Sequence, residues 1–220
     1  MNDASPQQAQ LINQVFSRLE THYGRYGWWH LEEPYEVMVG AILVQNTSWK
    51  NVEKALANLA EHFNPHAIAQ MPVADLAELI RPSGYYNQKA LKLKAITSWF
   101  AHYRYSIQQV RQVDQQTLRQ QLLSVKGVGN ETADAILVYA IRKPSFVIDA
   151  YTRRIFTRNG LAVPASYDKF QALLESVIPQ DNDTYAYYHG LMVDHAQQFC
   201  HKTPKCSGCP LAQDCLGVTG

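Results

Sequence analysis

The sequence predicts an all-α fold with more than one layer of helices. Apolar residues recur at helical spacing along most of the chain, beginning with Leu11, Ile12, Val15 and Leu19 near the N-terminus. Start signals for helices precede these segments, and no two segments show the alternation expected of paired strands. We therefore expect about ten helices and no sheet, with no repeat or long linker between them.

The start signals predict where individual helices begin. Ser5 is a preferred N-cap residue, Pro6 suits the first helical position and Gln8 completes a capping box, so the first helix is expected to start here and to end near Gly24. Pro144–Ser145 marks a short break in the chain. Further helices are expected to begin at similar signals, which are Pro34, Ser48, Asn64–Pro65, Asn87, Ser166–Tyr167 and Asp183.

Composition limits the class of protein. With 220 residues, 46% hydrophobic and 18% charged, the chain has enough apolar sequence for one large or two small globular domains. No apolar run approaches the roughly 20 residues of a membrane span, and the stretch MNDASPQQAQ lacks the regions of a signal peptide. We expect a cytoplasmic protein without a membrane partner. Because the net charge is only +1, any nucleic-acid surface would be a local patch.

A glycine-rich turn precedes one of the predicted helices, in the stretch LLSVKGVGNETADAILVYA at residues 122–140. Gly127 and Gly129 allow a tight backbone with positive φ and leave its amides uncovered. The helix that begins near Asn130 directs its amides and its positive dipole end at the same place, which favours an anion such as a phosphate. Taken alone, this pattern more often closes an ordinary corner between two helices.

All four cysteines lie close together near the C-terminus, in CHKTPKCSGCPLAQDC. Four thiolates so close in sequence are typical ligands of one metal centre, and the spacing fits zinc and an iron-sulfur cluster equally well. Disulfides are not expected in a cytoplasmic chain. The nearby His195 and His201 are interpreted as surface residues, since four sulfurs suffice. The predicted ligands are Cys200, Cys206, Cys209 and Cys215.

Three of these features together resemble the endonuclease III branch of the helix-hairpin-helix DNA glycosylases. They are the hairpin KGVGNETADAIL, the later segment VIDAYTRRI and the cysteine loop, and the resemblance extends from Trp28 to Cys215. It implies that the cysteine loop at 200–215 carries a [4Fe-4S] cluster and that Asp149 is catalytic, although the first cysteine gap is five residues rather than the family's six. The residues expected to grip the DNA backbone are Lys126, Gly127, Val128 and Gly129.

The resemblance also implies two helical domains. A six-helix domain over residues 30–148 would contain the hairpin, and residues 1–29 and 149–220 would form the second domain, with a cleft for a flipped nucleotide between them. Gln45 in ILVQNT and Tyr85 in SGYYNQK match the wedge positions that fill the gap in the DNA. Arg153 is expected at a phosphate. Without the resemblance, Gln45 would be interpreted as a solvent-facing helix end and Tyr85 as a packed loop aromatic.

The resemblance gives meaning to Glu131. Bifunctional members of the family carry a lysine here, whose amine forms a Schiff base with the sugar, and a carboxylate cannot do so. The expected chemistry is therefore hydrolysis without strand cleavage, in which Asp149 stabilises the oxocarbenium-like sugar. The sequence alone interprets Asp149 as the N-cap of the helix AYTRRIFTRNG, and it can serve both purposes.

Aromatic residues suggest which base is removed. Trp28, Trp29 and Trp49, with Glu131, are the predicted base pocket, and here the chain resembles the iron-sulfur 3-methyladenine DNA glycosylases, although His30 replaces a proline. Tryptophans at such positions are usually part of a core, but an aromatic sandwich suits a cationic alkylated purine. The expected protein is a monomeric glycosylase acting on damaged double-stranded DNA. The alternatives are an endonuclease III-like or adenine-mismatch-type glycosylase for another lesion, and a non-catalytic DNA-binding module.

Overall fold

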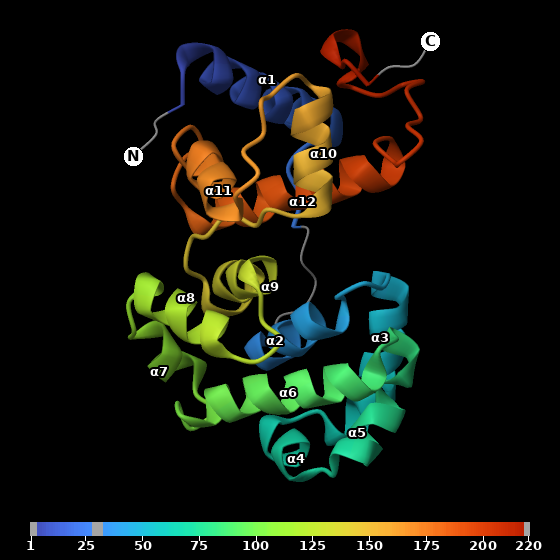
Figure 1. Ribbon diagram of the computed structural model, residues 1–220, viewed down its shortest axis with the longest axis vertical. Helices are drawn as coiled ribbons and strands as arrows, with labels where there is room; N and C mark the ends of the chain where they lie inside the picture. Colours follow the sequence, from blue (N-terminus) through green and yellow to red (C-terminus); the bar gives the residue numbers. More distant parts are fainter. Residues whose placement is uncertain (1–3, 28–32, 218–220) are drawn as a thin grey trace. The chain divides into compact units, whose positions relative to one another are not determined.

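A computed structural model describes residues 4–27 and 33–217, and these residues contain helices and no strands (Figure 1). No helix in this part of the chain is long and apolar enough to cross a membrane. A π-helix (η3, Ile136–Ile141) continues α9, and short 3-10 turns occur at Ala60–His62, Arg81–Ser83 and Ala212–Asp214. The α-helices are α1 (Pro6–Tyr23), α2 (Pro34–Leu43), α3 (Trp49–Leu59), α4 (Pro65–Gln70), α5 (Val73–Leu79), α6 (Tyr86–Ala101), α7 (Ile107–Arg111), α8 (Gln115–Ser124), α9 (Asn130–Ala135), α10 (Ala150–Arg158), α11 (Tyr167–Glu175) and α12 (Asn182–Gln198).

The chain divides into two compact units. One unit comprises Leu31–Lys143 and contains α2 to α9 with η3; we call it the hairpin unit. The other comprises Met1–His30 and Pro144–Gly220 and contains α1, α10, α11, α12 and the cysteine loop; we call it the cysteine unit. The predicted break at Pro144–Ser145 is confirmed, since no helix spans it.

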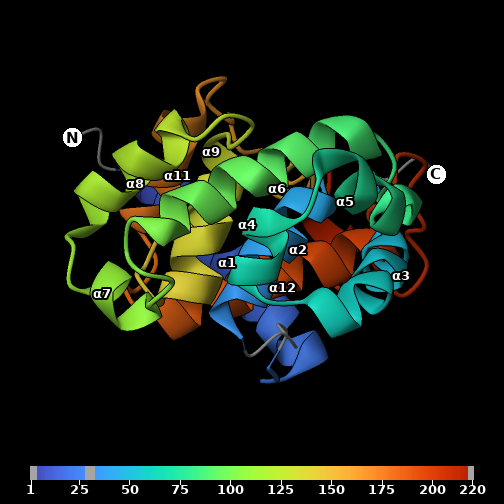
Figure 2. The ribbon, with the colours of Figure 1, turned by 90° about the horizontal axis from the view of Figure 1, so that it is seen from below.

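Helix α2 is the central helix of the hairpin unit. Eight of its ten residues are buried, as expected of a helix that is apolar on every side. It contacts α3, α6, α9 and η3, while α6 also crosses α4 and α5 (Figure 2). Because α2 is held on all sides, the turn that follows Leu43 has a fixed position in this unit.

Aromatic packing holds the cysteine unit together. Phe16 of α1 stacks on Tyr188 of α12, with ring centroids 4.1 Å apart, and meets Phe146 and Phe156 edge to face. Burial of such rings is a large apolar contribution to stability. The packing joins α1 to α10 and α12, although α1 lies far from both in the sequence.

Most of the predicted helix starts are confirmed. Ser5 and Gln8 form the complete capping box, with Ser5 N donating to Gln8 Oε1 at 2.9 Å and Gln8 N donating to Ser5 Oγ at 3.2 Å. Asn64 and Ser166 also cap helices with their side chains. Helices begin directly after Ser48 and at Pro34, as expected. Local capping chemistry therefore locates most of these helices correctly.

Two predicted starts are wrong by two residues. α12 begins at Asn182 rather than after Asp183, because the Asp181 carboxylate accepts from the backbone N–H of Asp183 and of Thr184, each at 3.0 Å. α6 begins at Tyr86 rather than after Asn87, and Tyr85 precedes it in a left-handed conformation with φ 47°. The chain turns at Tyr85 before it enters α6.

Candidate functional site

The glycine-rich turn lies in a helix-hairpin-helix, formed by α8, residues 125–129 and α9. Arg119 of α8 binds the fully buried Asp134 of α9 through two hydrogen bonds, of 2.8 and 3.2 Å. Val128 is buried and anchors the turn in the unit, whereas Lys126 and Gly129 are exposed. The hairpin is therefore held from inside, with the backbone around its glycines near the surface.

Gly127 has two reasons to be glycine. Its φ of +90° is strained for any other residue, and a Cβ built there would lie 2.3 Å from Cγ of Lys92. Gly129 differs from the prediction, since its φ is −99° and a Cβ would meet nothing within 4 Å. The tight turn thus depends on one glycine, Gly127, because of both its positive φ and the close approach of the Lys92 stem.

Gln45 lies against the hairpin rather than at a free, solvent-facing helix end. Its Nε2 donates to the carbonyl oxygen of Gly127 at 3.1 Å and to Oγ1 of Thr132 at 3.0 Å. Its Oε1 accepts from Nζ of Lys92 at 2.5 Å. The Gln45 side chain therefore braces the turn after α2 against Gly127 and Thr132, which lie on either side of the start of α9.

Tyr85 stands out among the large aromatic residues. It is 68% exposed, so it is not the packed loop aromatic that the sequence suggests when taken alone. Its left-handed backbone is uncommon for a residue other than glycine and carries strain that the surrounding structure must hold. The structure thus presents an exposed ring at a turn with a left-handed backbone.

Lysine usually forms the solvated face of a helix, but two lysines of α6 have partners inside the protein. Lys89 is 2% exposed, and its Nζ donates to the carbonyl oxygens of Leu43 at 2.8 Å and Ser83 at 2.7 Å. Burial, followed by the nearby positive charge of Lys92, lowers the pKa of Lys89 to about 8. Nζ of Lys94 donates to the carbonyl oxygens at the end of α4.

The helical pattern contains the signal that would have identified Lys89. The buried residues Leu93, Ile96 and Phe100 follow it at intervals of four, seven and eleven positions. A residue at this spacing lies on the same face as the apolar stripe of its helix. The spacing of Lys89 therefore predicts burial in spite of its charge.

The predicted base-pocket residues are only partly described. Glu131 is exposed in the first turn of α9, and Trp49 is half-buried at the first position of α3. Trp28 and Trp29 lie outside the described residues. The assignment of these side chains to a base pocket therefore stays a prediction.

Asp149 is the N-cap of α10, in the cysteine unit. Its Oδ1 accepts from the backbone N–H of Thr152 at 2.6 Å, which confirms the capping interpretation. Its Oδ2 lies 3.7 Å from Nε2 of His189 on α12, and the residue is 8% exposed. Burial alone would raise the pKa of the Asp149 carboxyl, but His189 and the Thr152 amide outweigh it and hold the pKa below the ordinary value for aspartate. The buried carboxylate of Asp149 is therefore held in its charged form at neutral pH.

The arginines of α10 all have partners inside the cysteine unit. Arg153 donates to the carbonyl oxygen of Pro164 at 2.8 Å and lies over the ring of Phe170. Arg154 donates to the carbonyl oxygen of Cys200 at 2.7 Å. A phosphate contact by Arg153 stays a prediction, and it would have to share the guanidinium with these partners.

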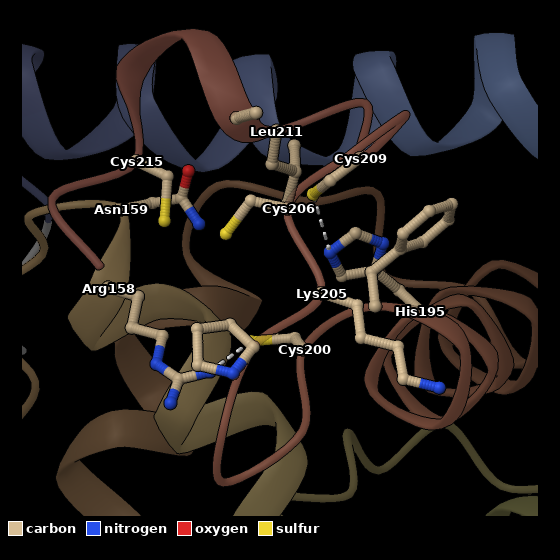
Figure 3. A pocket seen from close by; sticks show the side chains of 12 residues that line it. Arg158, Asn159, His195, Cys200, Lys205, Cys206, Cys209, Leu211 and Cys215 are labelled. Atoms are coloured by element: carbon tan, nitrogen blue, oxygen red, sulfur yellow. Dashed lines mark hydrogen bonds between the residues drawn. The ribbon is translucent and has the colours of Figure 1, made fainter. Parts of the chain in front are cut away.

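The four cysteines line one pocket (Figure 3). Arg158 closes one side of it, with Nη1 donating to Sγ of Cys200 at 3.1 Å and to the carbonyl oxygen of His201 at 2.7 Å. His195 is 1% exposed and points Nε2 at Sγ of Cys209, 3.8 Å away, so its interpretation as a surface residue is wrong. Burial raises the pKa of the Cys209 thiol. Four thiols lining one pocket have the chemistry of a thiolate-bound metal centre. Among the described residues, however, no three side chains of the metal-binding types are gathered closely enough to hold an ion in this conformation.

The all-helical fold with a helix-hairpin-helix defines the general class of the protein. Residues 39–180 match the family model described as HhH-GPD superfamily base excision DNA repair protein, and the chain belongs to this superfamily. Its similarity to known relatives extends over nearly the whole length. "Putative DNA repair glycosylase MJ1434" of Methanocaldococcus jannaschii is 43% identical over 212 residues, which cover 94% of this chain and 96% of the relative.

Other relatives and solved structures agree with this assignment. Endonuclease III of Thermotoga maritima is 29% identical over 83% of each chain. The 3-methyladenine DNA glycosylase MagIII of H. pylori, solved with 1,N6-ethenoadenine, has 29% identity and a TM-score of 0.72 over 87% of this chain and 97% of that one. An endonuclease III–DNA complex has a TM-score of 0.80 at 23% identity over 95% and 96%, and it supports the fold. The predicted membership of the helix-hairpin-helix glycosylases is therefore confirmed.

Proposed function

We propose that the protein is a monofunctional DNA N-glycosylase that removes an alkylated purine, such as 3-methyladenine, from double-stranded DNA. The observation that carries this proposal is the buried carboxylate of Asp149, held by the Thr152 amide and 3.7 Å from Nε2 of His189, in a chain that has Glu131 where lyases of the family have lysine. The similarity to a 3-methyladenine DNA glycosylase supports the substrate class.

Asp149 would supply the electrostatic stabilisation. Breaking the glycosidic bond leaves a sugar with oxocarbenium character, and a fixed anion stabilises it most where water is excluded. The amide of Thr152 holds one oxygen of Asp149, and His189 stands beside the other. The carboxylate is thus preorganised, and it is poised to orient the attacking water.

The hairpin would hold the DNA without reading its sequence. The backbone amides of Gly127, Val128 and Gly129, with the ammonium of Lys126, are groups that bind phosphate oxygens. Tyr85 is exposed enough to fill the gap left by a flipped nucleotide, as wedge side chains do. Gln45 would act beside it while bracing the hairpin, and Arg153 would add a phosphate contact.

The base pocket would be aromatic. Trp28, Trp29 and Trp49 would enclose the flipped base, and Glu131 would contribute a negative charge. An alkylated purine is cationic, so aromatic faces attract it by about 0.5–2 kcal/mol more than a neutral base. A cationic base is also a good leaving group, and modest catalysis suffices to release it.

The cysteine loop would carry a [4Fe-4S] cluster bound by Cys200, Cys206, Cys209 and Cys215. Such a cluster would supply redox-active iron and a covalent link across the loop. The loop is already tied to α10 through Arg158. The Arg158 side chain donates to Sγ of Cys200, and the Arg158 carbonyl oxygen accepts from the N–H of Leu216 at 2.7 Å. We infer a structural role for the loop, and no step of base removal depends on it.

A panel of damaged duplexes tests the substrate class. Each duplex would carry one lesion, and free base would be measured by chromatography. We expect release from alkylated DNA and from ethenoadenine duplexes. Since relatives include thymine-DNA glycosylase of Aeropyrum pernix and endonuclease III, the panel would also carry thymine mismatches and oxidised pyrimidines. Release confined to either of these lesions would reject the alkylpurine assignment, and binding without release from any lesion would indicate a DNA-binding module.

Borohydride trapping tests the role of Glu131. The unmodified protein should give no covalent adduct with damaged DNA, because no amine is placed to form an imine. Glu131→Lys should give an adduct to the extent that its amine is deprotonated near the sugar, and Glu131→Gln is the matched control without an amine. The unmodified protein could instead give strong trapping, and Lys126→Ala could abolish it. That result would show that Lys126 is the nucleophile.

Gly127→Val should weaken DNA binding by roughly tenfold or more, because a side chain at φ +90° carries about 1–3 kcal/mol of strain and collides with the Lys92 stem. Damaged and undamaged duplexes should lose affinity alike, since the hairpin contacts only backbone. Gly129→Ala should lose less, because that backbone accepts a Cβ. Fluorescence anisotropy measures both variants, and a loss confined to damaged DNA would place the hairpin in the base pocket instead.

A further inference from the structure

The buried ammonium of Lys89 has no part in the chemistry proposed above. Its stem lies in the apolar stripe of α6, and its Nζ bonds two carbonyl oxygens, those of Leu43 and Ser83. Withdrawing a charge from water is unfavourable, and a neutral side chain of similar volume often fills such a place without loss of stability. We therefore look for the role of this charge in the two segments that the ammonium joins.

The two carbonyl oxygens belong to the two segments that carry the predicted wedge residues. Leu43 is the last residue of α2 and lies two positions before Gln45. Ser83 ends the short 3-10 turn Arg81–Ser83 and lies two positions before Tyr85. One ammonium group thus ties both segments to α6. The backbone N–H of Lys89 also donates to the carbonyl oxygen of Tyr85 at 3.0 Å.

Lys92 extends the same arrangement by one helical turn. Its Nζ donates to Gln45, and its stem lies against Gly127 of the hairpin. Helix α6 therefore holds three segments, the turn of Gln45, the turn of Tyr85 and the hairpin, through two lysines. All of these contacts lie within the hairpin unit.

We propose that Lys89 is a positioning residue that fixes the turn of Tyr85 against the end of α2, so that Tyr85 and Gln45 meet DNA at a preset separation. The proposal rests on the proposed function and deepens it. The left-handed backbone of Tyr85 persists only where its surroundings hold it. The ammonium supplies that restraint from inside, where DNA cannot displace it.

The test compares Lys89→Met with Lys94→Met in the full-length protein. Lys94 is the matched control, because its ammonium also binds carbonyl oxygens at a helix end, but these belong to α4. The first readout is the fluorescence of 2-aminopurine placed beside an abasic analogue, which reports insertion of a wedge. The second is single-turnover base release at saturating protein.

We expect Lys89→Met to lose the 2-aminopurine signal and to slow base release by roughly ten- to a hundredfold, since misplacement of a positioning group costs about that much. Affinity for undamaged duplex should change little, and Lys94→Met should match the parent in both readouts. In a Tyr85→Ala background, Lys89→Met should have little further effect, because both changes remove the same interaction with DNA.

Additive effects of Lys89→Met and Tyr85→Ala would overturn the proposal, and so would an unchanged fluorescence signal in folded Lys89→Met. If Lys89→Met does not fold, Lys89→Arg decides the matter through the same double-mutant comparison, because it keeps the charge while altering the reach. Failure of the proposed function would look different. The parent itself would then release no base, whereas the fluorescence comparison would still report on Lys89.

Discussion

Asp149→Asn should keep its affinity for damaged DNA and lose base release by roughly a hundred- to a thousandfold. Asparagine has nearly the same size and can still accept from the N–H of Thr152, so α10 keeps its cap. Only the negative charge beside the developing oxocarbenium disappears. Single-turnover base release, with affinity measured separately by anisotropy, separates the loss of chemistry from a loss of binding.

The matched control for this prediction is Asp181→Asn. Asp181 caps α12 as Asp149 caps α10, accepting from the N–H of Asp183 and Thr184, but it lies at the surface. The Asp181→Asn variant should retain full base release. Equal rates for Asp149→Asn and the parent would remove Asp149 from catalysis, and equal losses in the two variants would point to helix capping as the cause.

The lowered pKa of Asp149 also sets an expectation for acid. Because the folded-state pKa lies below the ordinary value for aspartate, the carboxylate contributes stability that is present above the unfolded pKa and is lost as the pH falls through the folded pKa. Asp149 should therefore stay ionised between about pH 5 and 8. Its protonation should lower neither base release nor the melting temperature in this range. Measuring the parent and Asp149→Asn side by side isolates this contribution, because the variant lacks the titrating group.

Cys206→Ser should lower the folded yield and the melting temperature as well as the iron content. Removing one of the four proposed thiolate ligands would weaken a centre whose binding free energy is also folding free energy. A loss of about 2 kcal/mol would lower the melting temperature by about 4–8 °C in a protein of this size. The parent should be yellow-brown with absorption at about 400 nm, and the variant should lose this absorption.

Ser207→Ala is the control for the cysteine variant, since Ser207 is an exposed neighbour in the same loop. It should keep colour, iron and stability. A colourless parent that holds one zinc ion after anaerobic preparation would replace the cluster by a zinc site. Normal stability in Cys206→Ser would show that the loop does not support the fold.

Local chemistry explains why much of the fold was predictable. The capping box at Ser5 and Gln8, the N-cap Asn64 and the N-cap Asp149 depend on residues only three positions apart, so the sequence contains the whole interaction. The family resemblance identified the hairpin and the cysteine loop in the same way, from short patterns.

Several residues have roles that depend on partners far away in the chain. Lys89 binds a carbonyl oxygen 46 positions away, and His195 is buried against a cysteine loop that closes after its helix ends. Gly127 is glycine partly because Lys92 lies over it. Charged and polar residue types favour a surface interpretation, and the tertiary packing supplies the partners that hold these residues inside.

The most direct test of monofunctional base removal follows one alkylated duplex through a single reaction. Free base is measured in one half of each sample, and the integrity of the strand is measured in the other half before and after alkali. We predict free alkylpurine in proportion to alkali-labile sites, with the strand intact until alkali is added. Strand breaks that accompany base release without alkali, or strand-bound protein after borohydride, would contradict the account.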